Sequence, residues 1–106
     1  MATIGHNRGS ERMYAIVFDL DTDILRATYR NASWNNAYTD IRGALEARGF
    51  EWMQGSTYFG NERVTAVDCV LAVQELKREY DWFQPAVRDI RMLRIEENND
   101  LIPAMN

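Results

Sequence analysis

An apolar segment that ends in alternating aspartates is the feature of this sequence that most suggests chemistry. Met13–Phe18 is apolar, and aspartates follow it at positions 19, 21 and 23. Carboxylates fixed at the end of a strand can hold a divalent ion or transfer protons while a phosphodiester is cleaved. Asp19, which directly follows the apolar segment, is therefore the first candidate for a functional residue.

Two established chemistries begin with a similar pattern, and the rest of the sequence argues against both. Residues 17–23 resemble the nucleophile motif of haloacid-dehalogenase-type phosphatases, which also need a doubly wound domain and later lysine and paired-aspartate motifs. A chain of 106 residues whose single lysine, Lys77, falls on a predicted helix does not supply these. A calcium-binding loop needs glycine at its sixth position and glutamate at its twelfth. This chain has Ile24 and Arg30 there.

The cysteine and histidine counts exclude several further classes of enzyme. The single cysteine, Cys69, lies in an apolar run and is predicted to be a buried structural thiol. The single histidine, His6, lies in a polar segment that we expect to be mobile. These counts exclude Ser-His-Asp and Cys-His sites and zinc sites built from cysteine and histidine. No segment resembles a signal peptide, so we expect a cytoplasmic protein with no membrane partner.

The charge of the chain limits its partners. The formal net charge is −4, which provides no broad positive field for extended binding to nucleic acid. Eleven arginines accompany one lysine. Arginine grips phosphate with a planar fork, but genome composition or surface ion pairing produces the same bias, and both explanations stay open. Any contact with nucleic acid must be local.

Hydrophobic patterning predicts four strands and three helices. The strands are expected at Met13–Phe18, Phe50–Gln54, Ser56–Phe59 and Val87–Glu96. The helices are expected at Asp21–Tyr29, from the N-cap Ser33 to Gly49, and at Val64–Tyr80. The second helix should bury Trp34, Ala37, Tyr38, Ile41, Ala44 and Leu45, and the third Val64, Val67, Val70, Leu71 and Leu76. Trp82 and Phe83, in a turn before the last strand, should fill the core.

This order of elements predicts an α+β domain with the ferredoxin-like βαββαβ fold. Its antiparallel four-stranded sheet carries the helices on one face. We expect the domain to span residues 12–97, between a disordered lead at 1–11 and a loose tail at 98–106. A domain of this size gains stability from association, so a homodimer is expected.

The predicted topology brings three residues to one rim of the sheet. The first strand lies between the third and fourth, and both are antiparallel to it, so Asp19, Ser56 and Asp89 should converge there. Arg88 and Arg91 would lie close by and could bind RNA phosphate. An alternative stays open, in which Asp19 only caps the next helix and Asp89 only pairs with an arginine.

Aromatic side chains could stack on RNA bases, but most of them stand where a core or a dimer interface needs them. Tyr58 is the aromatic residue that we retain as a candidate for base stacking.

Four segments together resemble the virulence-associated protein D (VapD) family. They are Met13–Leu20, Gly49–Tyr58, Trp82-Phe83 and Val87–Arg91, and the resemblance runs over residues 12–97. The Gln-x-Ser-x-Tyr pattern at 54–58 and the aspartate at the end of the first strand are also similar to the small CRISPR adaptation (Cas2-like) proteins, which share the fold and dimerise.

The resemblance implies a homodimeric endoribonuclease, in several members the toxin of a toxin-antitoxin pair with a small protein antitoxin. It implies functional positions at Asp19, Ser56 and Asp89, with Leu25 in a supporting position. Thr57 stands where members carry valine, which leaves the substrate preference open. Asp19 could act directly or through Mg²⁺. A metal ion is not required to activate water, because the 2′-hydroxyl of RNA can itself be the nucleophile. A non-catalytic dimer that binds nucleic acid or protein, and a small-ligand regulatory module, are the alternatives.

Overall fold

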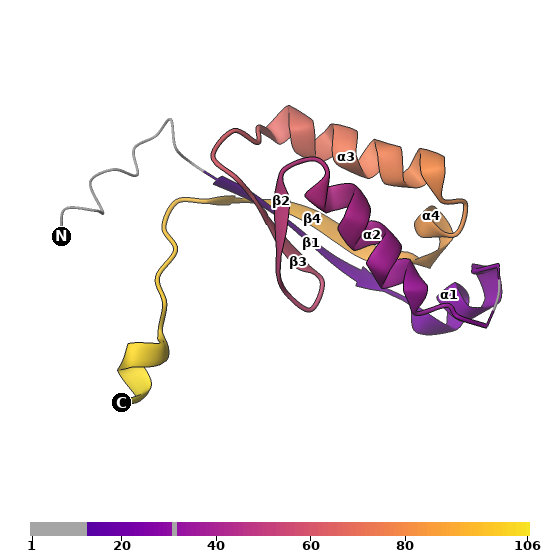
Figure 1. Ribbon diagram of the computed structural model, residues 1–106, viewed down its shortest axis with the longest axis horizontal. Coiled ribbons are helices and arrows are strands. Elements are labelled where there is room, and N and C mark those ends of the chain that lie inside the picture. Colours follow the sequence, from indigo (N-terminus) through magenta and orange to yellow (C-terminus); the bar gives the residue numbers. More distant parts are fainter. Residues whose placement is uncertain (1–12, 31) are drawn as a thin grey trace.

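A four-stranded antiparallel sheet forms the centre of the computed structural model, which describes residues 13–30 and 32–106. Its strands are β1 (Met13–Leu20), β2 (Phe50–Gln54), β3 (Thr57–Gly60) and β4 (Val87–Ile95), in the order β2-β3-β1-β4 (Figure 1). The long strands β1 and β4 pair along their whole length, from Met13 opposite Ile95 to Leu20 opposite Val87. The sheet and its antiparallel pairing confirm the predicted ferredoxin-like class, with β1 between β3 and β4.

Helices α2 (Asn36–Glu46) and α3 (Ala66–Glu79) lie over one face of this sheet (Figure 1). Helix α1 (Thr22–Thr28) and the short α4 (Phe83–Ala86) lie beside each other at the end of the sheet where β1 stops and β4 begins. Alternation along β1 turns Ile16, Phe18 and Leu20 toward the helices, where they join one buried cluster with residues of α2 and α3. Trp82 and Phe83 are buried in this cluster, as expected of the aromatic turn.

The sequence predicted only part of the face that α3 (Ala66–Glu79) buries: Leu76, and Val64 just before the helix, are buried as predicted. Thr65 and Asp68 begin it with a capping box, in which each side chain accepts a hydrogen bond from the other residue's backbone N–H. The buried residues of the helix are Cys69, Ala72 and Leu76. The expected core residues Val67, Val70 and Leu71 are exposed, Val67 by 65%. The prediction selected the larger apolar side chains, whereas the spacing of three and four residues places the small Cys69 and Ala72 inward, where the helix lies against the sheet.

Helix α2 begins two residues later than predicted, with Asn35 rather than Ser33 at the N-cap position. Backbone N–H groups at its start bond to carbonyls three residues back, as in Asn36 to Ser33 at 2.9 Å and Ala37 to Trp34 at 3.0 Å. This tighter turn uses the residues that were expected to form the first helical turn. The predicted stop at Gly49 is confirmed, because this glycine has φ of 93° three residues after the helix ends.

The tail after β4 runs away from the sheet and ends in the short 3-10 helix η3 (Ile102–Met105) (Figure 1). All of residues 98–106 are exposed. His6 and the expected N-terminal lead lie outside the described residues. In the part of the chain that the structure describes, no helix combines the length and the apolar character needed to span a membrane.

Candidate active site

Asp19 and Asp89 are direct cross-strand partners at the end of β1. Cross-strand partners lie on the same face of a sheet, here the face opposite the helices, and both carboxylates are exposed. Two carboxylates so placed repel each other, so their pairing in register requires compensating positive charge.

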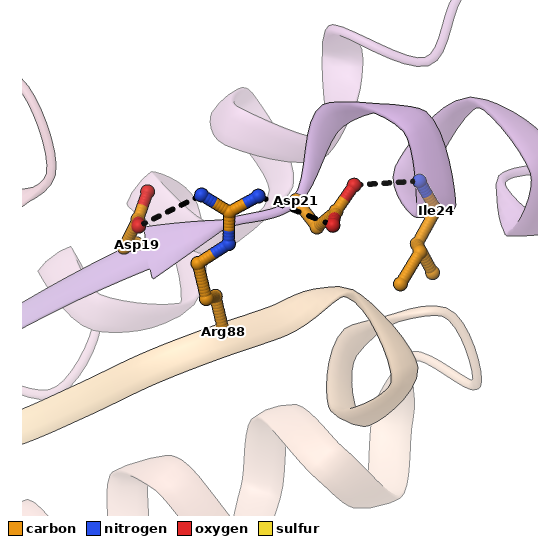
Figure 2. A network of polar contacts seen from close by, with 4 residues as sticks. All are labelled: Asp19, Asp21, Ile24 and Arg88. Atoms are coloured by element: carbon orange, nitrogen blue, oxygen red, sulfur yellow. Dashed lines mark hydrogen bonds and ion pairs between the residues drawn. The ribbon is translucent and has the colours of Figure 1, made fainter.

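Arg88 supplies part of that charge because a bulge interrupts the ladder beside Asp19. Leu20 pairs with Val87 while Asp19 pairs with Asp89, so Arg88 is the extra residue on β4. Its guanidinium lies 3.8 Å from the Asp19 carboxylate and donates a hydrogen bond of 3.2 Å to Asp21 (Figure 2). The bulge therefore aims one arginine between two aspartates.

Asp21 performs the capping role that the sequence left open for Asp19. Its Oδ1 accepts a hydrogen bond of 3.0 Å from the Ile24 backbone N–H and so caps α1 (Figure 2). This bond, followed by the hydrogen bond from Arg88, lowers the pKa of Asp21 below its usual value of 3.8. Asp21 was not singled out for a site role. The sequence does carry a signal for this cap, because Asp21 stands three residues before Ile24, the first apolar residue of α1.

Arg91 neutralises Asp89. Its Nε donates to both carboxylate oxygens at 3.1 Å, with the two residues adjacent on the same face of β4. The alternative explanation for Asp89, pairing with an arginine, therefore describes its contact correctly. The two arginines that were candidates for binding RNA each lie beside a carboxylate.

Ser56 flanks the other side of the end of β1. Its carbonyl accepts a hydrogen bond of 3.1 Å from the Phe18 backbone N–H, one residue before Asp19. The expected convergence of Asp19, Ser56 and Asp89 at one rim thus holds for their backbone positions. The Ser56 residue also lines a cleft between α2 and the β2–β3 hairpin, on the helix side of the rim.

Two further residues of the predicted set are buried. Leu25 is fully buried in α1, and its backbone N–H donates to the Asp21 carbonyl at 2.9 Å, so it anchors the helix that Asp21 caps. Tyr58 is 3% exposed and stacks on Phe18 with the ring centroids 6.1 Å apart. This corrects the expectation that Tyr58 stacks on a base, because the core already covers its ring.

The remaining groups that could do chemistry are the Cys69 thiol and clusters of metal-ligating side chains. Cys69 is buried, and burial raises the pKa of its thiol, as expected of a structural cysteine. Across residues 13–30 and 32–106, no three histidine, cysteine, aspartate or glutamate side chains are close enough together to hold a metal ion.

The sequence matches a known family of proteins over most of its length. The sequence model of the family described as CRISPR associated protein Cas2 matches residues 12–101. The chain is 50% identical over 94 residues to "Endoribonuclease VapD 2" of Riemerella anatipestifer, which covers 89% of this chain and 100% of that protein.

Two further relatives carry the same name. An "Endoribonuclease VapD homolog" of Helicobacter pylori is 52% identical over 93 residues, covering 88% of this chain and 96% of the relative. An "Endoribonuclease VapD" of Dichelobacter nodosus is 42% identical over 88 residues, covering 83% and 91%. The chain belongs to the VapD family, as the resemblance in its sequence indicated.

Proposed function

We propose that this chain is an endoribonuclease that cleaves RNA at the end of β1, where Asp19 and Asp89 are paired. The juxtaposition of these two exposed carboxylates with Arg88 carries the proposal, since the family membership gives the activity of named relatives but not the residues that perform it.

Asp19 is the residue that takes the proton from the attacking hydroxyl. The attacking group is the 2′-hydroxyl of RNA or a water molecule, and its oxygen forms a bond to phosphorus as its proton passes to the carboxylate. The bond from phosphorus to the leaving 5′-oxygen breaks, and that oxygen takes a proton from solvent. The Asp19 carboxylate is exposed and so is accessible to RNA.

Arg88 and Arg91 bind the non-bridging oxygens of the scissile phosphate. Arg91 contacts Asp89 through Nε, which leaves its Nη donors for phosphate. Asp89 therefore acts by holding this guanidinium, and Ser56 can donate its hydroxyl from the opposite side of the strand end. The protein has a net charge of −4, and both arginines at the site are paired with carboxylates. Because it can bind only a few phosphates, its substrate is short single-stranded RNA.

Mg²⁺ can take part only together with the substrate. Two carboxylates, one of them 3.8 Å from Arg88, are a donor set for an ion that keeps several waters and binds phosphate oxygen. Asp19 and Asp89 would hold such an ion, which would supply positive charge to the phosphate.

We also propose that the protein is a homodimer formed through the sheet face opposite the helices. Val17 of β1 lies on this face with its partners Thr57 and Arg91, and Phe59 and Leu93 lie there opposite Ala15. Leu93 is an exposed apolar side chain on this face. Asp19 and Asp89 lie on the same face, so a second copy would turn a shallow rim into a cleft.

The toxin-antitoxin role and the location in the cytoplasm are further proposals, supported by the VapD resemblance and by the buried free thiol. A short open reading frame beside the gene whose product binds this chain and blocks RNA cleavage would support the first. A neighbouring gene product that leaves cleavage unchanged would argue against it.

The test of the catalytic proposal compares two aspartate variants. Purified wild-type protein, Asp19→Asn and Asp23→Asn are incubated with labelled RNA, with and without Mg²⁺. Asp23 lies in the first turn of α1, outside the contacts of the site, so the same substitution there is the matched control. Cleavage should fall about 100-fold or more in Asp19→Asn and stay unchanged in Asp23→Asn. Equal cleavage by Asp19→Asn and wild type would reject the assignment, and RNA binding without cleavage by wild type would favour the non-catalytic alternative.

A further inference from the structure

A cleft of about 380 Å³ lies between α2 and the β2–β3 hairpin, beside the candidate active site. The nearly buried rings of Phe18 and Tyr58 border the cleft, and Thr39 and Ser56 are lining residues with hydroxyl groups. Its size and composition are those of small-ligand sites, which are mostly apolar with a few polar groups. Of the residues that line this cleft, the proposed mechanism uses only Ser56.

Trp52 and Arg42 form a stacked pair at this cleft. The Arg42 guanidinium carbon lies 4.5 Å from the centre of the Trp52 ring. The indole N–H donates a hydrogen bond of 2.8 Å to the Gly55 carbonyl, which fixes the plane of the ring. Arg42 also donates to Glu46 at 3.2 Å, which holds the guanidinium over the indole. The pair is therefore preorganised, and Trp52 is still 41% exposed.

The cleft lies near the strand end that holds Asp19, because Phe18, the residue before Asp19, is among its lining residues. Ser56 lines the cleft and its carbonyl bonds to the backbone N–H of Phe18, the residue before Asp19. Tyr38 also lines the cleft. Burial raises the pKa of the Tyr38 hydroxyl, and the negative charge of Asp19 raises it further. An RNA strand with one base in the cleft would therefore pass the rim of the sheet where Asp19 lies.

We propose that this cleft binds one unstacked nucleobase of single-stranded RNA, stacked on the Arg42–Trp52 pair. Unpaired bases are commonly held on aromatic rings and guanidinium planes, and their edges by polar side chains. Tyr38 and Thr39 supply hydroxyl groups, each able to donate and to accept, around the edge of such a base. A base carries no net charge, so the cleft can add affinity to the few phosphate contacts that an acidic chain makes.

This inference rests on the proposed function only in taking RNA as the ligand. The test measures binding of short, labelled single-stranded RNA by fluorescence anisotropy, with Asp19→Asn protein so that cleavage does not interfere. Trp52→Ala in this background should weaken binding about fivefold or more, the range expected for one stacked base. Trp52→Phe should retain most of the affinity. Leu71→Ala is the control, because Leu71 is an exposed apolar residue on the outer side of α3, 43% exposed as the Met53 side chain of β2 is, and does not line the cleft.

A second set of RNAs carries one abasic nucleotide at each position in turn. At the position that the cleft recognises, the abasic RNA should bind the Asp19→Asn protein as weakly as intact RNA binds the variant that also carries Trp52→Ala. The abasic nucleotide and Trp52→Ala together should reduce the RNA affinity little more than either change alone. Additive losses, or unchanged binding by Trp52→Ala, would overturn the inference. Thermal unfolding of each variant shows whether a loss of binding reflects a loss of fold.

The outcomes separate this inference from the proposed function. Wild-type protein that binds RNA through Trp52 but does not cleave it would overturn the endoribonuclease proposal alone. Cleavage with binding that does not depend on Trp52 would overturn the base-binding cleft alone. A lack of measurable RNA binding would overturn both.

Discussion

Arg88 donates a hydrogen bond of 3.2 Å to Asp21 across 67 residues of sequence. The same guanidinium lies 3.8 Å from Asp19 (Figure 2). The contact joins the start of α1 to the bulge of β4, and it divides the roles of the two aspartates. Asp21 is committed to the fold through its helix cap, whereas Asp19 makes only the longer ion pair and can take part in chemistry.

The cap and the ion pair of Asp21 predict a pH-dependent contribution to stability. Its pKa is lowered in the folded state, first by the Ile24 backbone N–H and then by Arg88. A carboxyl group with a lowered pKa stabilises the fold above its unfolded pKa, and the stabilisation is lost as the pH falls through its folded pKa, below 3.8. We expect Asp21→Ala to unfold at a lower temperature than wild type at neutral pH.

The measurement is thermal unfolding of both proteins from neutral pH to below pH 3. The two midpoints should approach each other in acid, because wild-type Asp21 is then protonated. A difference that stays constant over this range would show that the carboxylate charge contributes nothing.

The face that α3 buries can be tested with two leucines on the same helix. Leu76 is 1% exposed in the core, whereas Leu71 is exposed. Leu76→Ala should lower the free energy of unfolding by about 2–5 kcal/mol, because it leaves a cavity. Leu71→Ala should change it by about 0.5 kcal/mol or less. Chemical denaturation measures both. Equal losses would mean that α3 packs with the face that the sequence pattern first indicated.

Much of the fold followed from the sequence because the strands have clear patterns and the order of elements permits few topologies. Once β1 is placed between β3 and β4, the positions of Ser56 and Asp89 beside its end follow. The full buried face of α3 did not follow, because Val67 and Leu71 are more hydrophobic than the small Ala72, yet Ala72 is the one that is buried.

The details of the site were less predictable. The position of Arg88 depends on a shift of one residue in the β1–β4 register, and nothing in the local sequence marks this bulge. The Arg42–Trp52 contact joins α2 to β2, and such a pair can be found only when both elements are placed in space. The rim of the sheet could therefore be predicted from the sequence, but the contacts that distinguish one aspartate from another could not.

The proposed dimer predicts that a charge on the sheet face opposite the helices produces monomers. Leu93 is an exposed apolar residue on that face, so Leu93→Arg would place two guanidinium groups in the interface of a symmetric pair. Light scattering after size exclusion should give twice the chain mass for wild type and the chain mass, 12.3 kDa, for the variant. Leu71→Arg on the outer side of α3 is the control and should stay dimeric. A dimer that tolerates Leu93→Arg would place the interface elsewhere.

The small number of arginines at the site predicts a weak dependence of RNA binding on salt. Single-stranded RNA releases about 0.7 counterions for each phosphate that a protein neutralises. If Arg88 and Arg91 are the contacts, the logarithm of the binding constant should fall with the logarithm of the salt concentration with a slope of about −1.4. Arg91→Gln should reduce that slope to about −0.7, because one phosphate contact is lost. Anisotropy titrations of Asp19→Asn protein over a range of salt concentrations measure the slope. A steep slope that Arg91→Gln leaves unchanged would show that RNA binds to other cationic groups, and the phosphate-binding role of Arg91 would then be wrong.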